Sequence, residues 1–258
     1  MSKILQQDYQ EYSKLIEEGH SQRSACLILG LNRSTIQRYI KGVLEDEIDY
    51  VVETLSNKPS ILFYDIETTL AKSYHFGQWK QNIGVKQQVQ EGHLLSHAWA
   101  WNDGDVIGSI LTREEVLDHD PERLVLEAWA LFDNADIIVA HYGKKFDIPK
   151  MNGYFLKYGL QPPSPFKVVD TKEISSKKFL LPFNSLEYLA KALGVQQKID
   201  NSGIQLWIDC DHGKQESLDE MLAYNIGDVE ALRDVYNRLI TWDNNGVNMA
   251  LYNNEHEA

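Results

Sequence analysis

The stretch ILFYDIETT at residues 61–69 decides the fold of this chain. Its first four residues are apolar or aromatic, which predicts a strand buried inside a sheet. Asp65 and Glu67 stand two positions apart at the end of that strand, so their side chains leave it on the same face. Neighbouring carboxylates repel each other, and a divalent cation that neutralises both makes the pair tolerable. Two solvated acids at an exposed strand end are the alternative.

A second pattern of strand followed by acid lies at IIVAHYGKKFD, residues 137–147. The apolar run predicts a strand, and Asp147 begins a helix beside the carboxyl edge of the sheet. The alternative for Asp147 is an ordinary first-turn acid of a helix. Lys144 and Lys145 in the connecting loop offer a local clamp for phosphate, unless they are simply solvated.

The third pattern is the pair Tyr224 and Asp228 in a long helical stretch near the carboxyl end. Residues four apart in a helix lie on the same face, so the phenol and the carboxylate can reach one bound water molecule. A core tyrosine above a surface acid is the alternative. The three patterns together, in this order along the chain, are much less frequent by chance than any one of them.

The rest of the carboxyl-terminal part alternates between strand and helix patterns. Further strands are predicted at 94–101, 106–111, 137–140 and 167–169, and helices at 121–132, 148–158, 185–193 and 218–240. This order predicts an α/β fold with a mixed sheet flanked by helices. Asp170 and Lys172 follow the strand at 167–169, where Asp170 is either a fifth acid lining the cleft or the cap of the next helix.

Residues 8–42 carry helical spacing of apolar groups, interrupted at Gly30. The string SACLILGLNRSTIQRYIKG resembles helix-turn-helix modules of the resolvase and invertase type, with a small residue at Cys26, the turn glycine at Gly30 and a buried Ile36. The resemblance implies a DNA-contacting face with six residues: Arg33, Ser34, Thr35, Gln37, Arg38 and Lys41. A three-helix bundle that only docks on its neighbour is the alternative.

The 258 residues suffice for one large domain with a small appendage. We expect a helix-turn-helix domain at 1–44, a linker at 45–59, a large α/β domain at 60–242 and a flexible tail at 243–258. Cys26 and Cys210 are too few for a disulfide scaffold or a thiolate zinc site. No apolar run has the length of a membrane span and no signal peptide opens the chain, so a cytoplasmic location is expected.

The net charge of −13 is unusual for a protein that binds nucleic acid. Residues 1–42 hold six Lys or Arg and four acids, a balance of +2, which leaves −15 for the remainder. Long-range attraction therefore cannot hold a phosphate backbone on the main domain. Contact with nucleic acid must depend on local basic residues or on bound cations.

The motifs YDIETT, the FD of HYGKKFD, and Tyr224 with Asp228 resemble the three exonuclease motifs of the DEDD superfamily. The tyrosine four positions before the last aspartate matches the DEDDy branch. The resemblance covers roughly residues 60–241 and is greatest to the proofreading domain of family B DNA polymerases and to YprB-type ribonuclease-H-like proteins. The chain departs from the pattern at Tyr142, where many members have asparagine.

The resemblance implies a two-metal-ion 3′→5′ exonuclease that releases nucleoside 5′-monophosphates. Two divalent cations, Mg²⁺ or Mn²⁺, would be held by Asp65, Glu67, Asp147 and Asp228, with Asp65 bridging the pair. Tyr224 would orient the attacking water as a neutral phenol. Nucleic acid is the implied partner, DNA rather than RNA because of the amino-terminal module, together with replication or repair proteins.

Two other functions remain open at this point. Transposases and structure-specific endonucleases also join acidic metal ligands on a ribonuclease-H fold to DNA-binding modules, although their pattern usually ends in glutamate. A non-catalytic DNA-binding regulator is the second alternative, and the complete set of four acids argues against it.

Overall fold

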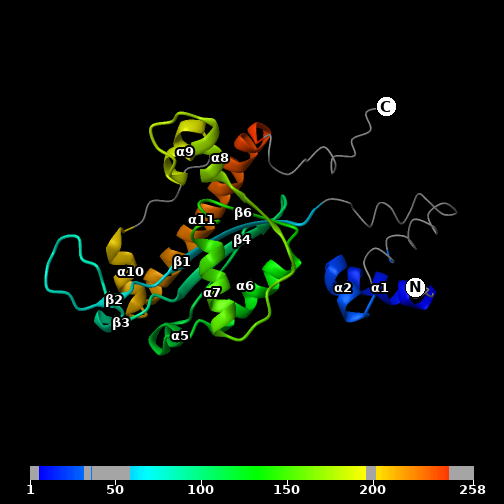
Figure 1. Cartoon of the computed structure of the whole chain (residues 1–258), viewed down its shortest axis with the longest axis horizontal. Coiled ribbons are helices and arrows are strands. Elements are labelled where there is room, and N and C mark those ends of the chain that lie inside the picture. Colours follow the sequence, from blue (N-terminus) through cyan, green and yellow to red (C-terminus); the bar gives the residue numbers. More distant parts are fainter. Residues whose placement is uncertain (1–5, 32–35, 37–58, 196–201, 244–258) are drawn as a thin grey trace.

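The computed structural model describes residues 6–31, 36, 59–195 and 202–243 (Figure 1). Its centre is a five-stranded mixed sheet with the strand order β5-β4-β1-β6-β7. β1 (Ile61–Thr68) pairs antiparallel with β4 (Leu94–Trp101), which pairs antiparallel with β5 (Ile107–Ile110). On its other side β1 pairs parallel with β6 (Ile137–Ala140), and β6 with β7 (Lys167–Asp170). The predicted mixed α/β fold is confirmed, with all five strands.

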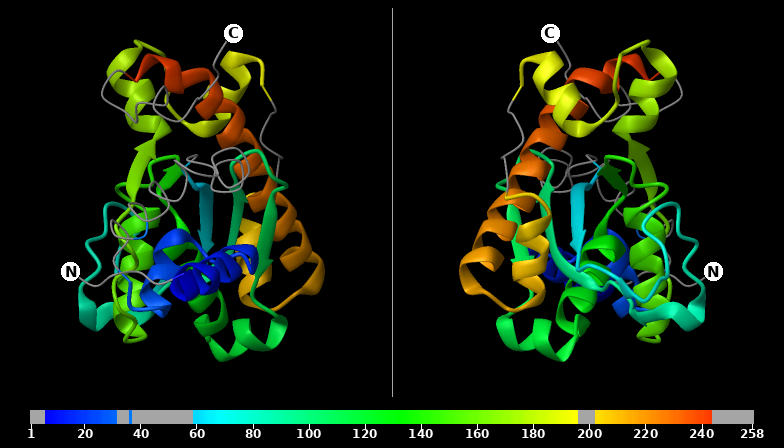
Figure 2. Two further views of the ribbon diagram at one scale, coloured as in Figure 1. Left: turned by 90° about the vertical axis from the view of Figure 1, so that its right-hand side faces the viewer. Right: turned by 90° about the vertical axis from the view of Figure 1, so that its left-hand side faces the viewer.

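Helices cover both faces of this sheet, and Figure 2 shows α7 and α11 on opposite sides of the strands. One face is covered by α6 (Glu122–Asn134) and α7 (Asp147–Lys157). The other face is covered by α8 (Thr171–Lys178), α9 (Leu186–Leu193) and the long α11 (Gln215–Leu239). The helix α9 begins one residue later than the predicted helix at 185–193, because Ser185 caps its start, and it ends as expected at Gly194, which has a φ of 63°.

The alternation of side chains along β1 divides the core into two layers. Leu62, Tyr64 and Ile66 pack toward α6 and α7, whereas Ile61 and Phe63 pack toward α9 and α11. The same alternation continues through the polar end of the strand, so Asp65 and Glu67 face the α11 layer. β1 extends to Thr68, beyond the apolar run seen in the sequence, because its pairing with β4 continues there.

Several short elements escaped prediction from the sequence. They are α5 (Arg113–Asp118), α10 (Ile204–Asp211), the hairpin of β2 (Lys72–Ser73) and β3 (Gln88–Gln90), and two single turns, η1 (Val85–Gln87) and η2 (Ile240–Trp242). Elements this short do not complete enough periods of an apolar pattern to be recognised. α10 packs beside the first half of α11, and the hairpin follows the end of β1.

The amino-terminal part contains α1 (Gln6–Glu17) and α2 (Gln22–Ile28), joined by a turn in which Ser21 caps α2. Tyr12, Ala25, Cys26 and Ile36 form a small buried cluster, and Gly30 has the positive φ expected of the turn. The residues assigned to DNA contact (33–35, 37, 38 and 41), most of the linker and nearly all of the tail lie outside the described residues. The helix-turn-helix therefore stays a prediction.

Both cysteines are buried, as expected for core thiols. Within the described part of the chain, every helix is too short or too polar to cross a membrane.

Candidate active site

Three of the four acids singled out in the sequence come together at one place. Asp65 and Glu67 from β1 and Asp228 from α11 each contribute a carboxylate oxygen, and the three oxygens lie within 4.8 Å of one another. More than 160 residues of sequence separate the strand from this part of the helix. The tertiary fold therefore assembles the acid cluster predicted from the YDIETT and YNIGD motifs.

The position of the cluster follows from the packing of α11 on the sheet. α11 lies across β1, β4 and β5, and the Tyr236 ring meets the Phe63 ring edge-on at a centroid distance of 5.2 Å. Phe63 is two residues before Asp65 on the same face of β1, and Tyr236 is two helical turns after Asp228. This apolar contact holds the helix in the register that brings its carboxylate to the strand.

A residue that the sequence analysis missed, Asn225, fixes the orientation of Asp65. Asn225 is fully buried, and its Nδ2 donates a hydrogen bond of 2.7 Å to Asp65 Oδ2. Its Oδ1 accepts a hydrogen bond of 3.0 Å from Ser96 Oγ on β4. Asn225 directly follows Tyr224 and precedes Asp228 by three positions, which is the helical spacing that could have marked it as part of the site.

Asp147 is not one of the three clustered carboxylates. It begins α7, it is almost fully buried, and its carboxylate accepts hydrogen bonds from its own N–H and from that of Ile66. The parallel pairing of β1 with β6 ends at Phe63 and Val139, so the carboxylate takes the N–H of Ile66 beyond the end of β6. Burial raises the pKa of Asp147 to about 7, the N–H donors oppose this shift, and the nearby Asp170 adds to it.

Asp170 has a clear structural task as the cap of α8. Its carboxylate accepts hydrogen bonds from the main-chain N–H groups of Lys172 and Glu173 at the start of that helix. It also accepts from the N–H groups of Tyr142 and Lys144 in the loop before α7, at 3.0 and 3.2 Å. Of the two interpretations offered by the sequence, the cap is the one for which the structure shows contacts.

The lysines of this region are already engaged with neighbours. Lys144 Nζ lies 2.5 Å from Glu173 Oε2, which places it in an ion pair. The ammonium groups of Lys145 and Lys172 lie 5.9 and 4.2 Å from the centre of the Tyr142 ring. Tyr142 has a φ of 68°, a left-handed conformation that asparagine adopts more easily than tyrosine.

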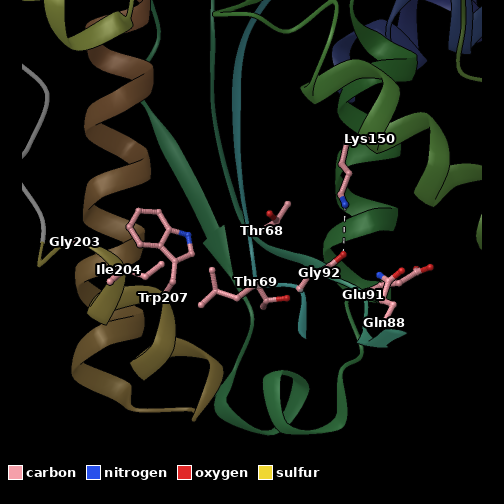
Figure 3. Close-up of a pocket in the computed structure, with 11 residues that line it drawn as sticks. Thr68, Thr69, Gln88, Glu91, Gly92, Lys150, Gly203, Ile204 and Trp207 are labelled. Atoms are coloured by element: carbon pink, nitrogen blue, oxygen red, sulfur yellow. Dashed lines mark hydrogen bonds between the residues drawn. The ribbon is translucent and has the colours of Figure 1, made fainter. Parts of the chain in front are cut away.

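An open groove of about 760 Å³ lies at the end of β1 (Figure 3). Its lining includes Thr68, the residue after Glu67, together with Lys150 of α7 and Trp207 of α10. Figure 3 shows Trp207 and Lys150 on opposite sides of Thr68 and Thr69. The Trp207 ring also meets the ring of Tyr224 edge-on at 6.0 Å. Tyr224 is itself buried and lies one helical turn before Asp228 on α11.

The donor set of the cluster suits a hard divalent cation. All three donors are carboxylate oxygens, the ligands that Mg²⁺ and Mn²⁺ prefer. Asp65 is held in one orientation by the amide of Asn225, an outer-shell contact of the kind that tunes metal ligands. A cation between the three oxygens would also relieve the repulsion among carboxylates that lie so close together.

Comparisons with known proteins agree with this fold. A family profile described as RNase_H superfamily matches residues 62–240. Among solved structures, a family B DNA polymerase from the hyperthermophilic archaeon Pyrobaculum calidifontis is similar, with a TM-score of 0.53 and 13% sequence identity. The match covers 70% of this chain and 24% of the polymerase chain. No curated protein sequence matches significantly. The profile covers more than half of the chain and includes both β1 and α11, so the chain belongs to the RNase_H superfamily.

Proposed function

We propose that this protein is a nuclease, and more narrowly a two-metal-ion 3′→5′ exonuclease that shortens nucleic acid to nucleoside 5′-monophosphates. The observation that carries the proposal is the meeting of three carboxylate oxygens from Asp65, Glu67 and Asp228 within 4.8 Å, beside an open groove. The RNase_H superfamily profile and the similarity to a DNA polymerase support a substrate of nucleic acid.

Each acid has a distinct part in the proposed site. Asp65 would bridge two divalent cations, Glu67 and Asp228 would complete the shell of one, and Asp147 would serve the other. Such a cation pair lowers the pKa of the attacking water and stabilises the charge that develops on the leaving 3′-oxygen. Asn225 keeps Asp65 pointed at the cluster through its hydrogen bond of 2.7 Å. The removal of this amide would loosen the site without removing a ligand.

Tyr224 would hold the attacking water by a hydrogen bond from or to its phenol oxygen. Its position one helical turn from Asp228 supports this role, because both groups face the same side of α11. The edge-on contact with Trp207 restrains the Tyr224 ring next to the groove. Positioning of this kind contributes to the rate by reducing the freedom of the reacting groups before attack.

The groove would hold the terminal nucleotide of a strand. Trp207 offers an aromatic face or edge to a base, and Lys150 on the opposite wall offers a positive charge to a phosphate. The Lys150 ammonium donates to the carbonyl oxygen of Gly92 at 3.4 Å, so it stands at the rim of the groove. Local charges of this kind, together with the cations, would compensate for the acidic net charge of −13.

The test is digestion of oligonucleotides labelled at either end, with Mg²⁺, with Mn²⁺ and with a chelator. A 3′→5′ exonuclease converts a 5′-labelled strand into a descending ladder and releases a labelled mononucleotide at once from a 3′-labelled strand. Single-stranded DNA, duplex DNA and RNA of one sequence rank the substrates, and we expect DNA to be preferred.

The matched variants are Asp65→Asn and Glu67→Gln in the cluster and Glu187→Gln on the exposed side of α9 as the control. We expect each cluster variant to lose more activity than the roughly 10- to 100-fold typical of an outer-shell change. Glu187→Gln should keep full activity. Internal cuts or strand joining would point to an endonuclease or a transposase, and unchanged digestion by Asp65→Asn would overturn the assignment of the site.

A further inference from the structure

A segment next to the groove has a composition opposite to that of the rest of the chain. Between Glu67 and Glu91 there is no acidic residue, whereas this stretch contains Lys72, Lys80 and Lys86. We call residues 71–90 the arm. It includes the β2–β3 hairpin and the loop between these strands, and Figure 1 shows it in cyan, projecting from the body. The whole chain has a net charge of −13, whereas this stretch has lysines and no acids. Its local charge is therefore opposite in sign to that of the chain as a whole.

The arm also exposes aromatic rings that a folded chain would ordinarily bury. Tyr74 is 79% exposed, Trp79 is 85% exposed and Phe76 is fully exposed. The burial of rings of this size contributes favourably to the free energy of folding. The exposure of three of them in one short segment therefore points to an interaction site. Polar or small residues (His75, Gly77 and Gln78) separate the three rings in the sequence, so the rings are not one continuous apolar run.

The base of the arm is firmly attached beside the groove. Lys72 forms an ion pair with the nearly buried carboxylate of Asp211 at the end of α10. The N–H of Tyr74 donates to the carbonyl oxygen of Gln87 at 2.9 Å, and Gln87 Nε2 donates back to the Tyr74 carbonyl oxygen at 3.2 Å. Ala71 and Gln88, at the two ends of the arm, both line the groove. A strand that leaves the groove therefore meets the arm next.

We propose that the arm is a binding platform for single-stranded nucleic acid. Bases would stack on the rings of Tyr74, Phe76 and Trp79, and the ammonium groups of Lys80 and Lys86 would contact phosphates. This inference rests on the proposed function for its direction: with the 3′ end in the groove, the arm holds nucleotides further toward the 5′ end. Aromatic stacking accepts every base, so the platform does not select a sequence.

The charge of the arm favours nucleic acid as its occupant over a protein surface. Every charged side chain of the arm is a lysine, and the lysine of the base, Lys72, is the one that is paired with Asp211. Lys80 and Lys86 are exposed in the same loop as the three rings. Exposed aromatic and basic side chains in one segment match a polyanion whose bases are available for stacking.

The binding test uses a 5′-fluorescein-labelled single-stranded DNA of 20 nucleotides in EDTA, so that hydrolysis does not interfere. Fluorescence anisotropy gives the Kd for the wild-type protein and for the triple variant Tyr74→Ala, Phe76→Ala, Trp79→Ala. We expect the triple variant to bind at least about tenfold more weakly, since loss of one stacking contact alone typically costs that order. The control is Leu180→Ala with Phe183→Ala, which removes exposed apolar side chains from the segment between α8 and α9.

A second pair of variants tests the charge. Lys80→Ala with Lys86→Ala should reduce the slope of log Kd against log salt concentration by roughly 1.4, the value for two lost contacts with a single strand. Lys191→Ala, an exposed lysine on α9, is the matched control and should leave the slope unchanged. Quenching of tryptophan fluorescence by the oligonucleotide should also decrease in Trp79→Phe.

Hydrolysis of the 4-nitrophenyl ester of thymidine 5′-monophosphate separates this inference from the proposed function. The rings of Tyr74, Phe76 and Trp79 do not line the groove, so the triple variant should hydrolyse this small ester at the wild-type rate with Mn²⁺. Failure of the wild-type protein on every substrate would refute the exonuclease, while the binding experiment in EDTA would still decide about the arm. Unchanged oligonucleotide binding by the triple variant would overturn the platform and leave a protein as the occupant of the arm.

Discussion

The buried side-chain amide of Asn225 donates a hydrogen bond of 2.7 Å to Asp65 Oδ2, and so links α11 to the central strand at the acid cluster. Ser96 on β4 donates in turn to the amide oxygen of Asn225 at 3.0 Å. A chain of two hydrogen bonds thus runs from β4 through α11 to β1. It holds the carboxylate of Asp65 in one orientation at the cluster.

We expect Asn225→Ala to raise the Mn²⁺ concentration needed for half-maximal binding by about 10- to 100-fold, the usual cost of losing an outer-shell partner. Isothermal titration calorimetry of the protein with Mn²⁺ measures this directly, without reference to activity. The exposed Asn152→Ala on α7 is the control and should bind Mn²⁺ like the wild type. An unchanged Kd in Asn225→Ala would show that the hydrogen bond to Asp65 does not serve the metal site.

The variant Tyr224→Phe keeps the ring that meets Trp207 and removes only the phenol oxygen. We expect kcat for 3′-end digestion to decrease by about 100-fold, comparable to the loss of one hydrogen bond made in the transition state. The melting temperature and Mn²⁺ affinity should stay close to those of the wild type.

Tyr236→Phe on the same helix is the matched control, because the Tyr236 hydroxyl is buried and has no hydrogen-bond partner among the residues that the structure describes. Its removal should leave kcat unchanged and should not destabilise the fold. Equal loss of kcat in the two variants would mean that the Tyr224 hydroxyl has no special role in the reaction.

Divalent cations should stabilise the protein through the cluster. At a Mn²⁺ concentration 100 times its Kd, binding contributes about 2.7 kcal/mol to the free energy of unfolding. This corresponds to a rise in melting temperature of roughly 5–10 °C for a domain of this size. In Asp228→Asn the rise should be absent, whereas the variant should be at least as stable as the wild type in EDTA because one repelling charge has been removed.

The control for this experiment is Asp219→Asn, an exposed acid earlier on the same helix. It should keep the full rise in melting temperature. Differential scanning fluorimetry over a series of Mn²⁺ concentrations distinguishes the two outcomes, and an equal rise in wild type and Asp228→Asn would place the cation elsewhere.

A buried histidine should make stability depend on pH. Burial lowers the pKa of His97, and the hydrogen bond of 3.0 Å between its Nε2 and Glu127 only partly opposes this effect. His97 Nδ1 is also buried without a hydrogen-bond partner, so a proton there would remain unsatisfied. The unfolded chain therefore takes up the proton at a higher pH than the folded protein does. The contribution of His97 to the free energy of unfolding is therefore fully present above the ordinary histidine pKa, and it is lost as the pH falls below that value.

Urea denaturation in EDTA between pH 8 and pH 5 measures this loss, with a slope of up to about 1.4 kcal/mol per pH unit for one proton. Burial also lowers the pKa of His93, which adds to this slope, whereas the pKa of Asp147, raised to about 7, contributes in the opposite direction. His97→Gln should remove one of the two histidine contributions, so this variant should lose less stability than the wild type as the pH falls. The exposed His212→Gln serves as the control and should reproduce the wild-type slope. An unaltered slope in His97→Gln would assign the whole pH dependence to other groups.

The residue pattern was sufficient to predict the sheet and its principal helices. The five strands and the helices α6, α7, α9 and α11 each carry an apolar periodicity of their own, and local periodicity is what a linear sequence displays. The spacing of Asp65 and Glu67 likewise showed that they share one face of a strand, because side chains alternate along any strand. Capping residues are also visible in a sequence, so the ends of α9, near Ser185 and at Gly194, could be located to within one residue.

Only the tertiary structure decided which groups meet. Asn225 became part of the site because packing of α11 on β1 brought it to Asp65, and no local pattern contains that contact. Asp147 and Asp170 look alike in the sequence as acids at helix starts, and both are buried, yet their partners separate them: the N–H of Ile66 faces Asp147, whereas Asp170 caps α8. Contacts between residues far apart in the sequence depend on how the layers pack, and the sequence of each element by itself does not contain that information.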